Sequence, residues 1–447
     1  MKKIIIALGL LIGGLSVTQA QQSHVILITV DGFRPEFYKD PSWGMVHLRQ
    51  AMAKGSYSDG VRGVFPSVTY PSHTTLVTGV KPIKHGIYYN TPPEPLGATG
   101  RWYWEYDALK VPSLWTAAKD AGLSTACVMW PVTVNAPINY RIPEYWFLPQ
   151  EKGGKNDNPG GMSKEAFPAG LYEEIQENVG GKMSAELFTS DVNNARMTAY
   201  LITKYKPAFT AVHLADVDHY EHEQGRDGDK VRSAVASADQ AIKTILDAVE
   251  KAGISEQTTV IVTGDHGFVD IHTQLNPNVL LAKAGLQDNA IKANWKAYFH
   301  SSGGSTFLHL KDKNDKRSLA KVREILSAMP AGQRKLFRIV ERAELDQVGA
   351  DPTVALALAP QQGITFGGST EGEVMRPVKG GTHGYFPDFR EIETGFVAFG
   401  RGIQKNVVVR QMGLEDIAPI IAQLLKLNLP SADGTFYPGL LLKDQAN

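Results

Sequence analysis

The chain has 447 residues, and its 46 basic and 46 acidic side chains cancel at pH 7 when the histidines are neutral. This balance excludes the strongly basic surface of a protein that coats nucleic acid. The length suits one large α/β domain with an insertion, or two domains. The single cysteine, Cys127, excludes an internal disulfide, and its apolar, strand-like surroundings predict a buried packing role.

The beginning of the chain has the pattern of a secretory signal peptide. Two lysines precede an apolar stretch from Ile4 to Val17, and small residues follow as far as Ala20. This stretch of about fourteen residues is shorter than the roughly twenty that span a bilayer. We therefore expect residues 1–20 to be a signal peptide that is cleaved near Ala20. Residues 21–447 would then be periplasmic or secreted, without a stable membrane anchor.

Apolar runs further along the chain predict strands that are buried on both faces of a parallel sheet. They cover residues 24–33, 124–130, 209–218, 258–267 and 394–400, and helix-like stretches lie at 111–121, 182–204, 229–252 and 414–426. This alternation predicts an α/β fold with a doubly wound, mostly parallel sheet flanked by helices. Residues 149–180, rich in glycine, proline and charge, predict a surface loop. Residues from about 270 to 380 predict a small inserted α+β cap.

Acidic residues and a histidine stand where several predicted strands end. Asp31 ends the first strand, Asp218 ends the run 209–218, and Asp265 and His266 end the run 258–267. Ligands of open α/β sheets bind beyond the carboxyl ends of the strands. These side chains are therefore candidates for a common site.

Two further histidines complete a pattern that is typical of metal ligands. Asp218 and His222 are four residues apart, a spacing that brings both side chains to one side of a helical turn. His383 lies in GGTHG, where the glycines let a metal or a backbone approach closely. Together with Asp31, Asp265 and His266, these residues offer three imidazoles and three carboxylates. Such a set can form two zinc-type sites, each with nitrogen and oxygen ligands.

A stiff turn provides a candidate nucleophile. In VFPSVTYPSHTTLVTG, residues 64–79, Pro66 and Pro71 restrict the backbone around Thr69, and a helix-like run follows. A threonine hydroxyl is a poor nucleophile at neutral pH, and a coordinated metal activates it. Taken alone, the turn would equally suit a helix N-cap at Thr69 or Ser72. We interpret Thr69 as a nucleophile that the prolines hold for in-line attack.

The motifs VDGF, FPSVTYPSH, HGIYYN, DVDHYEH, TGDHG and GTHGYF together resemble the nucleotide pyrophosphatase/phosphodiesterase family of the alkaline phosphatase superfamily. The resemblance extends from about residue 24 to residue 440 and implies an alkaline-phosphatase-like catalytic domain with two zinc ions. It implies one zinc site made by Asp31, Thr69, Asp265 and His266. It implies a second site made by Asp218, His222 and His383. It also implies that Thr69 is the nucleophile, that Asn90 donates to a phosphoryl oxygen, and that Tyr70 lies against a nucleobase.

Other candidate ligands are weaker. Asp216 and His219 flank the second-site pair, and only the register of the family motif favours Asp218 and His222 over them. His73 and His85 lie within matching motifs, but we interpret them as structural. The remaining histidines have no partner pattern: His24, His47, His213, His272, His300 and His309.

Alternative functions of the same superfamily would require residues that this sequence lacks. A sulfatase would carry Cys or Ser followed by x-Pro-x-Arg, whereas this turn begins with Thr69 and has no arginine. A phosphomonoesterase of this type would carry a Lys-x-Arg pair, but no Lys or Arg lies between Cys127 and Tyr140. The sequence therefore predicts a phosphodiesterase acting on a small phosphodiester or nucleotide, with no obligate protein partner. An alkaline phosphomonoesterase, a phosphonate hydrolase and a non-enzymatic binding module remain alternatives.

Overall fold

In a computed structural model of the protein, residues 22–149, 151, 158–179, 191–287 and 294–443 are described. The expected signal peptide lies outside these residues. Within them, no helix combines the length and the apolar character that crossing a bilayer requires.

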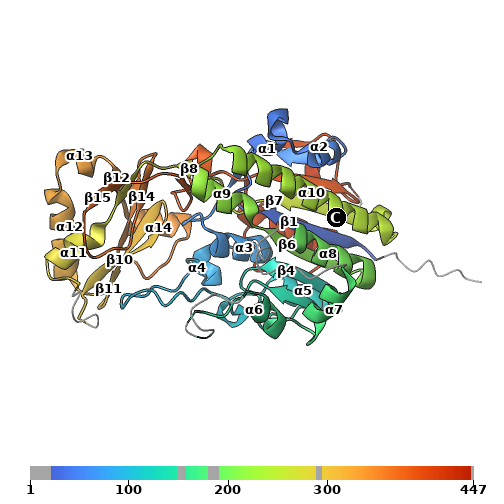
Figure 1. Ribbon diagram of the computed structural model, residues 1–447, viewed down its shortest axis with the longest axis horizontal. Coiled ribbons are helices and arrows are strands. Elements are labelled where there is room, and N and C mark those ends of the chain that lie inside the picture. Colours follow the sequence, from blue (N-terminus) through green and yellow to red (C-terminus); the bar gives the residue numbers. More distant parts are fainter. Residues whose placement is uncertain (1–21, 150, 152–157, 180–190, 288–293, 444–447) are drawn as a thin grey trace, which may run out of the picture.

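An eight-stranded sheet forms the centre of the larger part of the molecule (Figure 1). The order across it is β18 (Val408–Val409), β2 (Ser56–Ser58), β17 (Phe396–Gly400), β7 (Thr258–Thr263), β1 (His24–Val30), β6 (Phe209–Leu214), β4 (Thr125–Trp130) and β5 (Tyr140–Pro143). The strands from β7 to β5 are parallel, and β17 is antiparallel to both β7 and β2. The predicted α/β fold with a mostly parallel sheet is confirmed.

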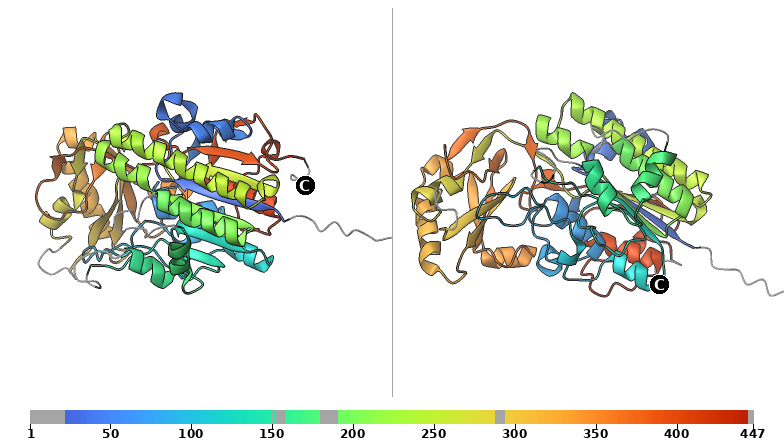
Figure 2. Two further views of the ribbon diagram at one scale, coloured as in Figure 1. Left: turned by 45° about the vertical axis from the view of Figure 1, so that its right-hand side comes forward. Right: turned by 60° about the horizontal axis from the view of Figure 1, so that its bottom comes forward.

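The side chains of β1 alternate between two apolar layers, as expected for a strand covered on both faces. Ile26, Ile28 and Val30 pack into one layer, and Val25 and Leu27 into the other. Helices on the first face are α2 (Val46–Met52), α7 (Leu171–Asn178), α8 (Asp191–Tyr205) and α10 (Asp229–Lys251), and helices on the second face are α3 (Thr69–Thr78), α5 (Leu114–Asp120) and α15 (Ile417–Leu425). The right-hand view of Figure 2 shows helices on both sides of the sheet.

The expectation of a surface loop over residues 149–180 is wrong for much of that segment. It contains α6 (Asn158–Glu165) and α7. Met162 of α6 and Leu171 and Ile175 of α7 are buried in the same apolar layer as α8 and α10. These few apolar residues at helical spacing stabilise two short helices in a segment whose glycines, prolines and charges suggested a loop.

The chain leaves the main sheet between β8 (Val269–Asp270) and β16 (Gly381–Thr382), which pair with each other. The intervening segment builds a four-stranded sheet from β10 (Ala297–Ser302), β11 (Ser305–Leu310), β13 (Leu356–Pro360) and β12 (Phe337–Glu341), and a three-stranded sheet from β14 (Ile364–Phe366), β9 (Thr273–Leu275) and β15 (Met375–Pro377). Its helices are α11 (Pro277–Lys283), α12 (Lys316–Ala328), α13 (Ala331–Arg334) and α14 (Arg342–Val348). It has an apolar core of its own and lies at the left of Figure 1.

The turn between β10 and β11 bonds the inserted part to the segment that follows β16. The backbone N–H of Gly304 donates to the carbonyl of His383 over 2.6 Å. A β-carbon on Gly303 would lie 2.6 Å from the same carbonyl oxygen, so a glycine is required there. The insertion is thereby bonded to the segment that carries one of the candidate metal ligands.

Candidate metal centre and nucleophile

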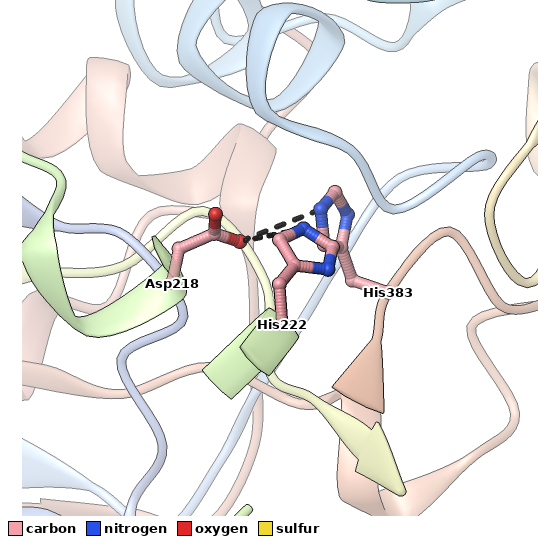
Figure 3. A group of neighbouring side chains, drawn as sticks. All are labelled: Asp218, His222 and His383. Atoms are coloured by element: carbon pink, nitrogen blue, oxygen red, sulfur yellow. Dashed lines mark ion pairs between the residues drawn. The ribbon is translucent and has the colours of Figure 1, made fainter. Parts of the chain in front are cut away.

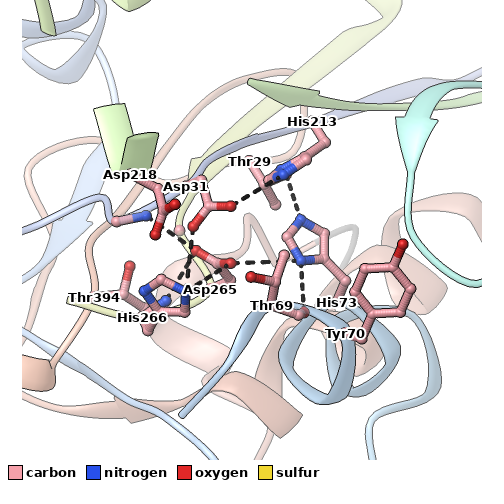
Figure 4. A network of polar contacts seen from close by, with 12 residues as sticks. Thr29, Asp31, Thr69, Tyr70, His73, His213, Asp218, Asp265, His266 and Thr394 are labelled. Carbon is pink, nitrogen blue, oxygen red and sulfur yellow. Dashed lines mark hydrogen bonds and ion pairs between the residues drawn. The ribbon is translucent and has the colours of Figure 1, made fainter. Parts of the chain in front are cut away.

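Three neighbouring strands bring the candidate ligands to one edge of the sheet. Asp31 follows β1, and Asp265 and His266 follow β7, which pairs with β1. Asp218 comes from α9 (Asp216–Gln224), which begins just after β6. The N–H of Asp31 also donates to the carbonyl of Leu214 at the end of β6, over 2.8 Å. The parallel arrangement therefore places these side chains together, as predicted (Figure 4). The prediction that Asp218 ends a strand is wrong, because β6 ends at Leu214 and Asp218 lies in the first turn of α9.

Asp31, Asp265 and His266 form what we call the buried group. His266 Nε2 lies 3.2 Å from Asp31 Oδ1 and 3.3 Å from Asp265 Oδ2. The other oxygen of Asp265 accepts hydrogen bonds from the N–H groups of Gly32, over 3.2 Å, and His266, over 3.0 Å. These bonds fix the Asp265 carboxylate so that Oδ2 faces the imidazole.

Asp218, His222 and His383 form what we call the open group (Figure 3). Asp218 Oδ1 lies 3.5 Å from His222 Nε2 and 3.4 Å from His383 Nε2. The two groups adjoin, because the rings of His383 and His266 stack at 3.7 Å with an interplanar angle of 8°. Asp218 also has a ligand atom within 4.8 Å of ligand atoms of Asp31 and His266. The structure thus assembles all six predicted side chains in two adjoining groups.

The tautomer of each histidine in the two groups follows from a backbone contact. Nδ1 lies 3.1 Å from Gly267 O in His266, 3.0 Å from Gly381 O in His222 and 3.1 Å from Ser67 O in His383. A carbonyl oxygen only accepts, so each Nδ1 donates, and a neutral ring then carries a lone pair on Nε2. Burial lowers the pKa of His266 well below its usual range and that of His383 to about 4, which keeps these two rings neutral.

Lone pairs therefore face lone pairs in this site, and a bound cation would resolve the conflict. Asp31 Oδ1, Asp218 Oδ1, Asp265 Oδ2 and His266 Nε2 are buried, and none has a hydrogen-bond partner in the described part of the chain. Burial and the nearby Asp218 carboxylate raise the pKa values of Asp31 and Asp265. Buried acceptors without donors are costly, and buried charges are usually paired or coordinate metal ions. The residues present therefore fit a metal centre of mixed nitrogen and oxygen ligands.

Thr69 is the first residue of α3, next to the buried group (Figure 4). The cap of this helix is Val68, which makes no side-chain cap bond, so the Thr69 hydroxyl is not used as an N-cap. Pro71 lies in the first helical turn, where its missing N–H removes no intrahelical bond. The α3 N-terminus thus lies at the candidate metal centre, where the helix dipole favours an anion.

Asn90 and Tyr70 lie beside Thr69 in different environments. Asn90 Oδ1 accepts a hydrogen bond from the Tyr70 N–H over 2.9 Å, which leaves the Asn90 NH₂ group as a donor. The Tyr70 side chain is fully buried, and its ring packs edge-on against Trp102 with centroids 5.1 Å apart. Burial also raises the pKa of Tyr70 well above its usual range. Direct contact between Tyr70 and a nucleobase stays a prediction, and the half-buried Trp102 lies next to it.

The weaker candidates have other partners. Asp216 and Asp191 exchange backbone-to-carboxylate hydrogen bonds of 3.1 and 3.2 Å, and His219 is exposed beside Tyr220. His85 Nε2 lies 3.1 Å from Thr75 Oγ1 within the packing of α3 and α4 (Pro82–His85). Asp218 and His222, in contrast, lie in the open group, in agreement with the register of the family motif.

Sequence reasoning missed one histidine of the site. His213, for which no partner pattern was found, lies with Nε2 3.2 Å from Asp31 Oδ2. It is a buried residue of β6, in the otherwise apolar run FTAVHL. A histidine in a strand covered on both faces needs a polar partner, and that signal would have marked it.

The segment after β4 provides no counter-charge for a second negative charge on a substrate. It contains neither Lys nor Arg between Cys127 and Tyr140. The next arginine, Arg141, donates to the carbonyl of Ala136 over 2.6 Å and packs over the ring of Phe167. Cys127 itself is buried, as predicted, and burial raises the pKa of its thiol to about 12.

A mostly parallel α/β sheet that gathers metal-type ligands around a helix-borne hydroxyl defines a class of enzymes, the metal-dependent hydrolases of phosphate esters. The family model described as type I phosphodiesterase / nucleotide pyrophosphatase matches residues 25–386, and the chain belongs to this family. The resemblance inferred from the motifs is thus confirmed. The family hydrolyses phosphodiester bonds and depends on metal ions.

Individual relatives are distant. Human ectonucleotide pyrophosphatase/phosphodiesterase family member 5 is 21% identical over 94% of this chain and 78% of its own length. Rat family member 3 and the venom phosphodiesterase CdcPDE of Crotalus durissus collilineatus are each 20% identical over 93% of this chain. The chain spans less than half of the length of these two, at 43% and 46%. The solved structure of murine family member 5 has the same fold, with a TM-score of 0.66, 19% identity and coverage of 94% of this chain and 100% of that one.

Proposed function

We propose that this protein is an exported, zinc-dependent phosphodiesterase or nucleotide pyrophosphatase that acts through a covalent intermediate on Thr69. The observation that carries the proposal is the set of buried, unpartnered carboxylate and imidazole atoms beside Thr69. Membership of the phosphodiesterase family supports the bond type. Mixed nitrogen and oxygen ligands favour zinc over magnesium, which prefers oxygen ligands alone.

The two groups would hold one zinc ion each. The buried group, together with the Thr69 hydroxyl, would hold the first, and the open group would hold the second. When bound, the ions supply positive charge that favours the Thr69 alkoxide and stabilises the charge developing in phosphoryl transfer. The three Nδ1–H bonds to backbone carbonyls hold the imidazoles in the orientation that this requires.

The reaction would proceed in two displacements at phosphorus. Thr69 Oγ forms a bond to phosphorus, the bond from phosphorus to the leaving oxygen breaks, and that oxygen leaves with the bonding electrons and acquires a proton. Water then attacks the Thr69 phosphodiester, releases the monoester product and restores the hydroxyl. Two inversions give net retention at phosphorus. The Asn90 NH₂ group donates to a non-bridging oxygen, and the N–H dipoles of α3 favour the same charge.

The charge of the site favours a phosphodiester or pyrophosphate substrate. A diester carries one negative charge, and the segment between Cys127 and Tyr140 adds no cation for a second. A solved structure of an inactive threonine-to-alanine variant of murine family member 5 is a complex with AMP. That complex supports a nucleotide as the small-molecule substrate of this chain and a nucleoside monophosphate as its product.

Export is proposed on the N-terminal sequence alone. The lysine pair, the apolar stretch and Ala20 form a signal-peptide pattern. Mass spectrometry of the protein expressed with its complete N-terminus should find a mature chain that begins near Gln21 outside the cytoplasm. An intact N-terminus on a cytoplasmic protein would contradict export.

A substrate panel tests the proposed activity. Zinc-loaded protein is assayed with p-nitrophenyl phosphate, bis-p-nitrophenyl phosphate, a nucleoside p-nitrophenyl phosphate and a dinucleotide. We expect the highest kcat/KM with the nucleoside diester, and release of a nucleoside monophosphate. A kcat/KM that favours p-nitrophenyl phosphate would make the protein a phosphomonoesterase. Absence of turnover and of bound zinc would indicate a binding protein.

A further inference from the structure

Three polar side chains lie behind the buried group and belong to neither set of metal-type ligands. Thr29, His73 and His213 are buried, with at most 1% of their surface exposed. Burying three polar side chains side by side is unfavourable unless they bond to one another. Their mutual contacts therefore indicate a specific arrangement.

The contacts form a continuous path from the nucleophile to the buried group (Figure 4). Thr29 Oγ1 lies 2.9 Å from His73 Nε2 and 3.1 Å from His213 Nδ1. At one end, His73 Nδ1 lies 2.9 Å from the backbone oxygen of Thr69. At the other end, His213 Nε2 lies 3.2 Å from Asp31 Oδ2. Thr29 is thus the bridge between the two histidines.

The direction of the bonds on the His73 side of this bridge is fixed. The Thr69 carbonyl only accepts, so His73 Nδ1 donates, and the neutral ring accepts at Nε2. The Thr29 hydroxyl must then donate to His73 Nε2. The Val212 carbonyl lies 3.3 Å from the same hydroxyl, but donation there would leave two lone pairs facing each other at His73. His213 contacts the Thr29 oxygen through Nδ1 and the Asp31 carboxylate through Nε2.

The backbone fixes the positions of these groups as well. Thr29 and His213 are register partners on the parallel strands β1 and β6. Asp31 follows Thr29 by two residues, and His73 lies one turn after Thr69 on α3. The path therefore joins the central strands to the helix that carries the nucleophile.

We propose that Thr29, His73 and His213 are positioning residues that hold the Asp31 carboxylate and the Thr69 backbone in a fixed relation. This inference rests on the proposed roles of Thr69 and Asp31. The three side chains are buried behind the metal-type ligands, so they would act through Asp31 and Thr69 and not by contact with a substrate. They keep the Thr69 hydroxyl next to the buried group and keep the Asp31 carboxylate turned toward its metal site. Partners that orient metal ligands in this way usually change metal affinity or activity by about 10–100-fold when removed.

A matched pair of variants at Thr29 tests the bridge. Thr29→Val keeps the β-branched shape of the side chain, which suits a strand, but removes the hydroxyl. Thr29→Ser keeps the hydroxyl. For Thr29→Val we expect kcat with the diester to fall about 10–100-fold with little change in KM, and Zn²⁺ to leave faster under a chelator. For Thr29→Ser we expect values within about threefold of wild type. His213→Phe, which keeps a ring without nitrogens, should resemble Thr29→Val and serves if that variant does not fold.

Thr259→Val is the control for loss of a buried threonine hydroxyl. Thr259 is 2% exposed on β7, at the other end of the sheet from the site, and its hydroxyl bonds to the carbonyl of Arg401. Its kcat and Zn²⁺ release should equal those of wild type. Equal losses in Thr259→Val and Thr29→Val would show a general packing effect and would overturn the inference.

A measurement without turnover separates this inference from the proposed activity. In the metal-free, folded protein, the Nδ1–H proton of His73, which is hydrogen-bonded to the Thr69 carbonyl, should give a resolved downfield proton NMR signal. Thr29→Val removes the donor to the Nε2 atom of the same ring and should shift this signal, and Thr29→Ser should preserve it. If wild type hydrolyses no phosphate ester, the proposed function fails while Zn²⁺ release and this signal still test the network. If Thr29→Val keeps wild-type kcat, Zn²⁺ release and signal, the network inference is wrong and the function stands.

Discussion

The buried group and the open group offer similar ligands but are enclosed very differently. The side chains of Asp265 and His266 are fully buried, whereas 44% of the His222 side chain is exposed. In the buried group, backbone N–H groups bind Asp265 and a histidine contacts Asp31. In the open group, His222 is anchored by one bond from its ring to the carbonyl of Gly381.

Under the proposed function, this difference predicts separate roles for the two groups. A charge in the buried group interacts more strongly with its neighbours, because little water screens it. Thr69 lies beside that group, where its hydroxyl would be activated most effectively. His222 of the open group faces solvent, and substrate and leaving group would enter and depart on that side. We therefore expect the buried group to retain its metal longer and the open group to exchange its metal more readily.

Removing the proposed nucleophile should have the largest effect while leaving both groups intact. Thr69→Ala should lower kcat by at least about 10⁴-fold, the scale seen when a catalytic nucleophile is lost. Zinc content, by elemental analysis, should stay near that of wild type, since six other ligands remain. Thr69→Ser should keep partial activity because a hydroxyl survives. Substantial turnover by Thr69→Ala would mean that water attacks phosphorus directly.

One ligand substitution in each group should reveal their unequal enclosure. Asp265→Asn and His222→Gln should each lower the zinc content by one ion and remove most of the activity. Added Zn²⁺ should restore part of the activity of His222→Gln, because that ligand lies at an accessible site. It should not restore Asp265→Asn, whose buried carboxylate also accepts two backbone bonds. Equal rescue of both variants would remove the distinction between the groups.

Asn90 should affect the transition state without affecting either metal. Asn90→Ala removes one donor to a non-bridging oxygen and should cost about 2.7–4 kcal/mol, or roughly 10²–10³-fold in kcat. Asn90→Asp, which keeps the size but lacks the NH₂ group, should lose as much or more. Unchanged kcat in Asn90→Ala with full zinc occupancy would exclude Asn90 from the reaction.

A buried ion pair beneath the open group should have the smallest effect on turnover. Arg34 Nε lies 2.8 Å from Glu221 Oε1, and Glu221 lies between Asp218 and His222 on α9. Arg34→Met leaves the buried Glu221 carboxylate without this partner and should destabilise the protein by about 3–5 kcal/mol. Denaturant unfolding measures this loss. Zinc should leave the open group faster than in wild type, and the buried group should be unaffected.

The positions of many site residues could be predicted from the sequence, because they depend on local sequence patterns. Asp31, Asp265 and His266 directly follow apolar runs, so their place at the ends of β1 and β7 follows from the strands themselves. Asp218, predicted to end the run 209–218, lies instead on α9, because β6 ends at Leu214. The site of a parallel sheet lies at that edge, so their proximity could be inferred too.

The enclosure of each group, in contrast, could not be predicted. His213 contacts Asp31 because β6 and β1 are neighbours in a particular register, and register depends on long-range pairing. The burial of Tyr70 depends on packing against Trp102, from a different segment. The helices α6 and α7 form because a few apolar residues meet a layer built by distant elements. Tertiary packing, which the local pattern does not contain, decided all three.

A zinc titration of the metal-free protein tests the central claim most directly, namely that two metal sites of unequal enclosure act together on Thr69. Bound zinc and phosphodiesterase activity are measured in the same samples as Zn²⁺ is added. We predict two successive equivalents, the tighter one filling the buried group, and activity that appears only as the second equivalent binds. Full activity after one equivalent, or a stoichiometry of one, would contradict the account.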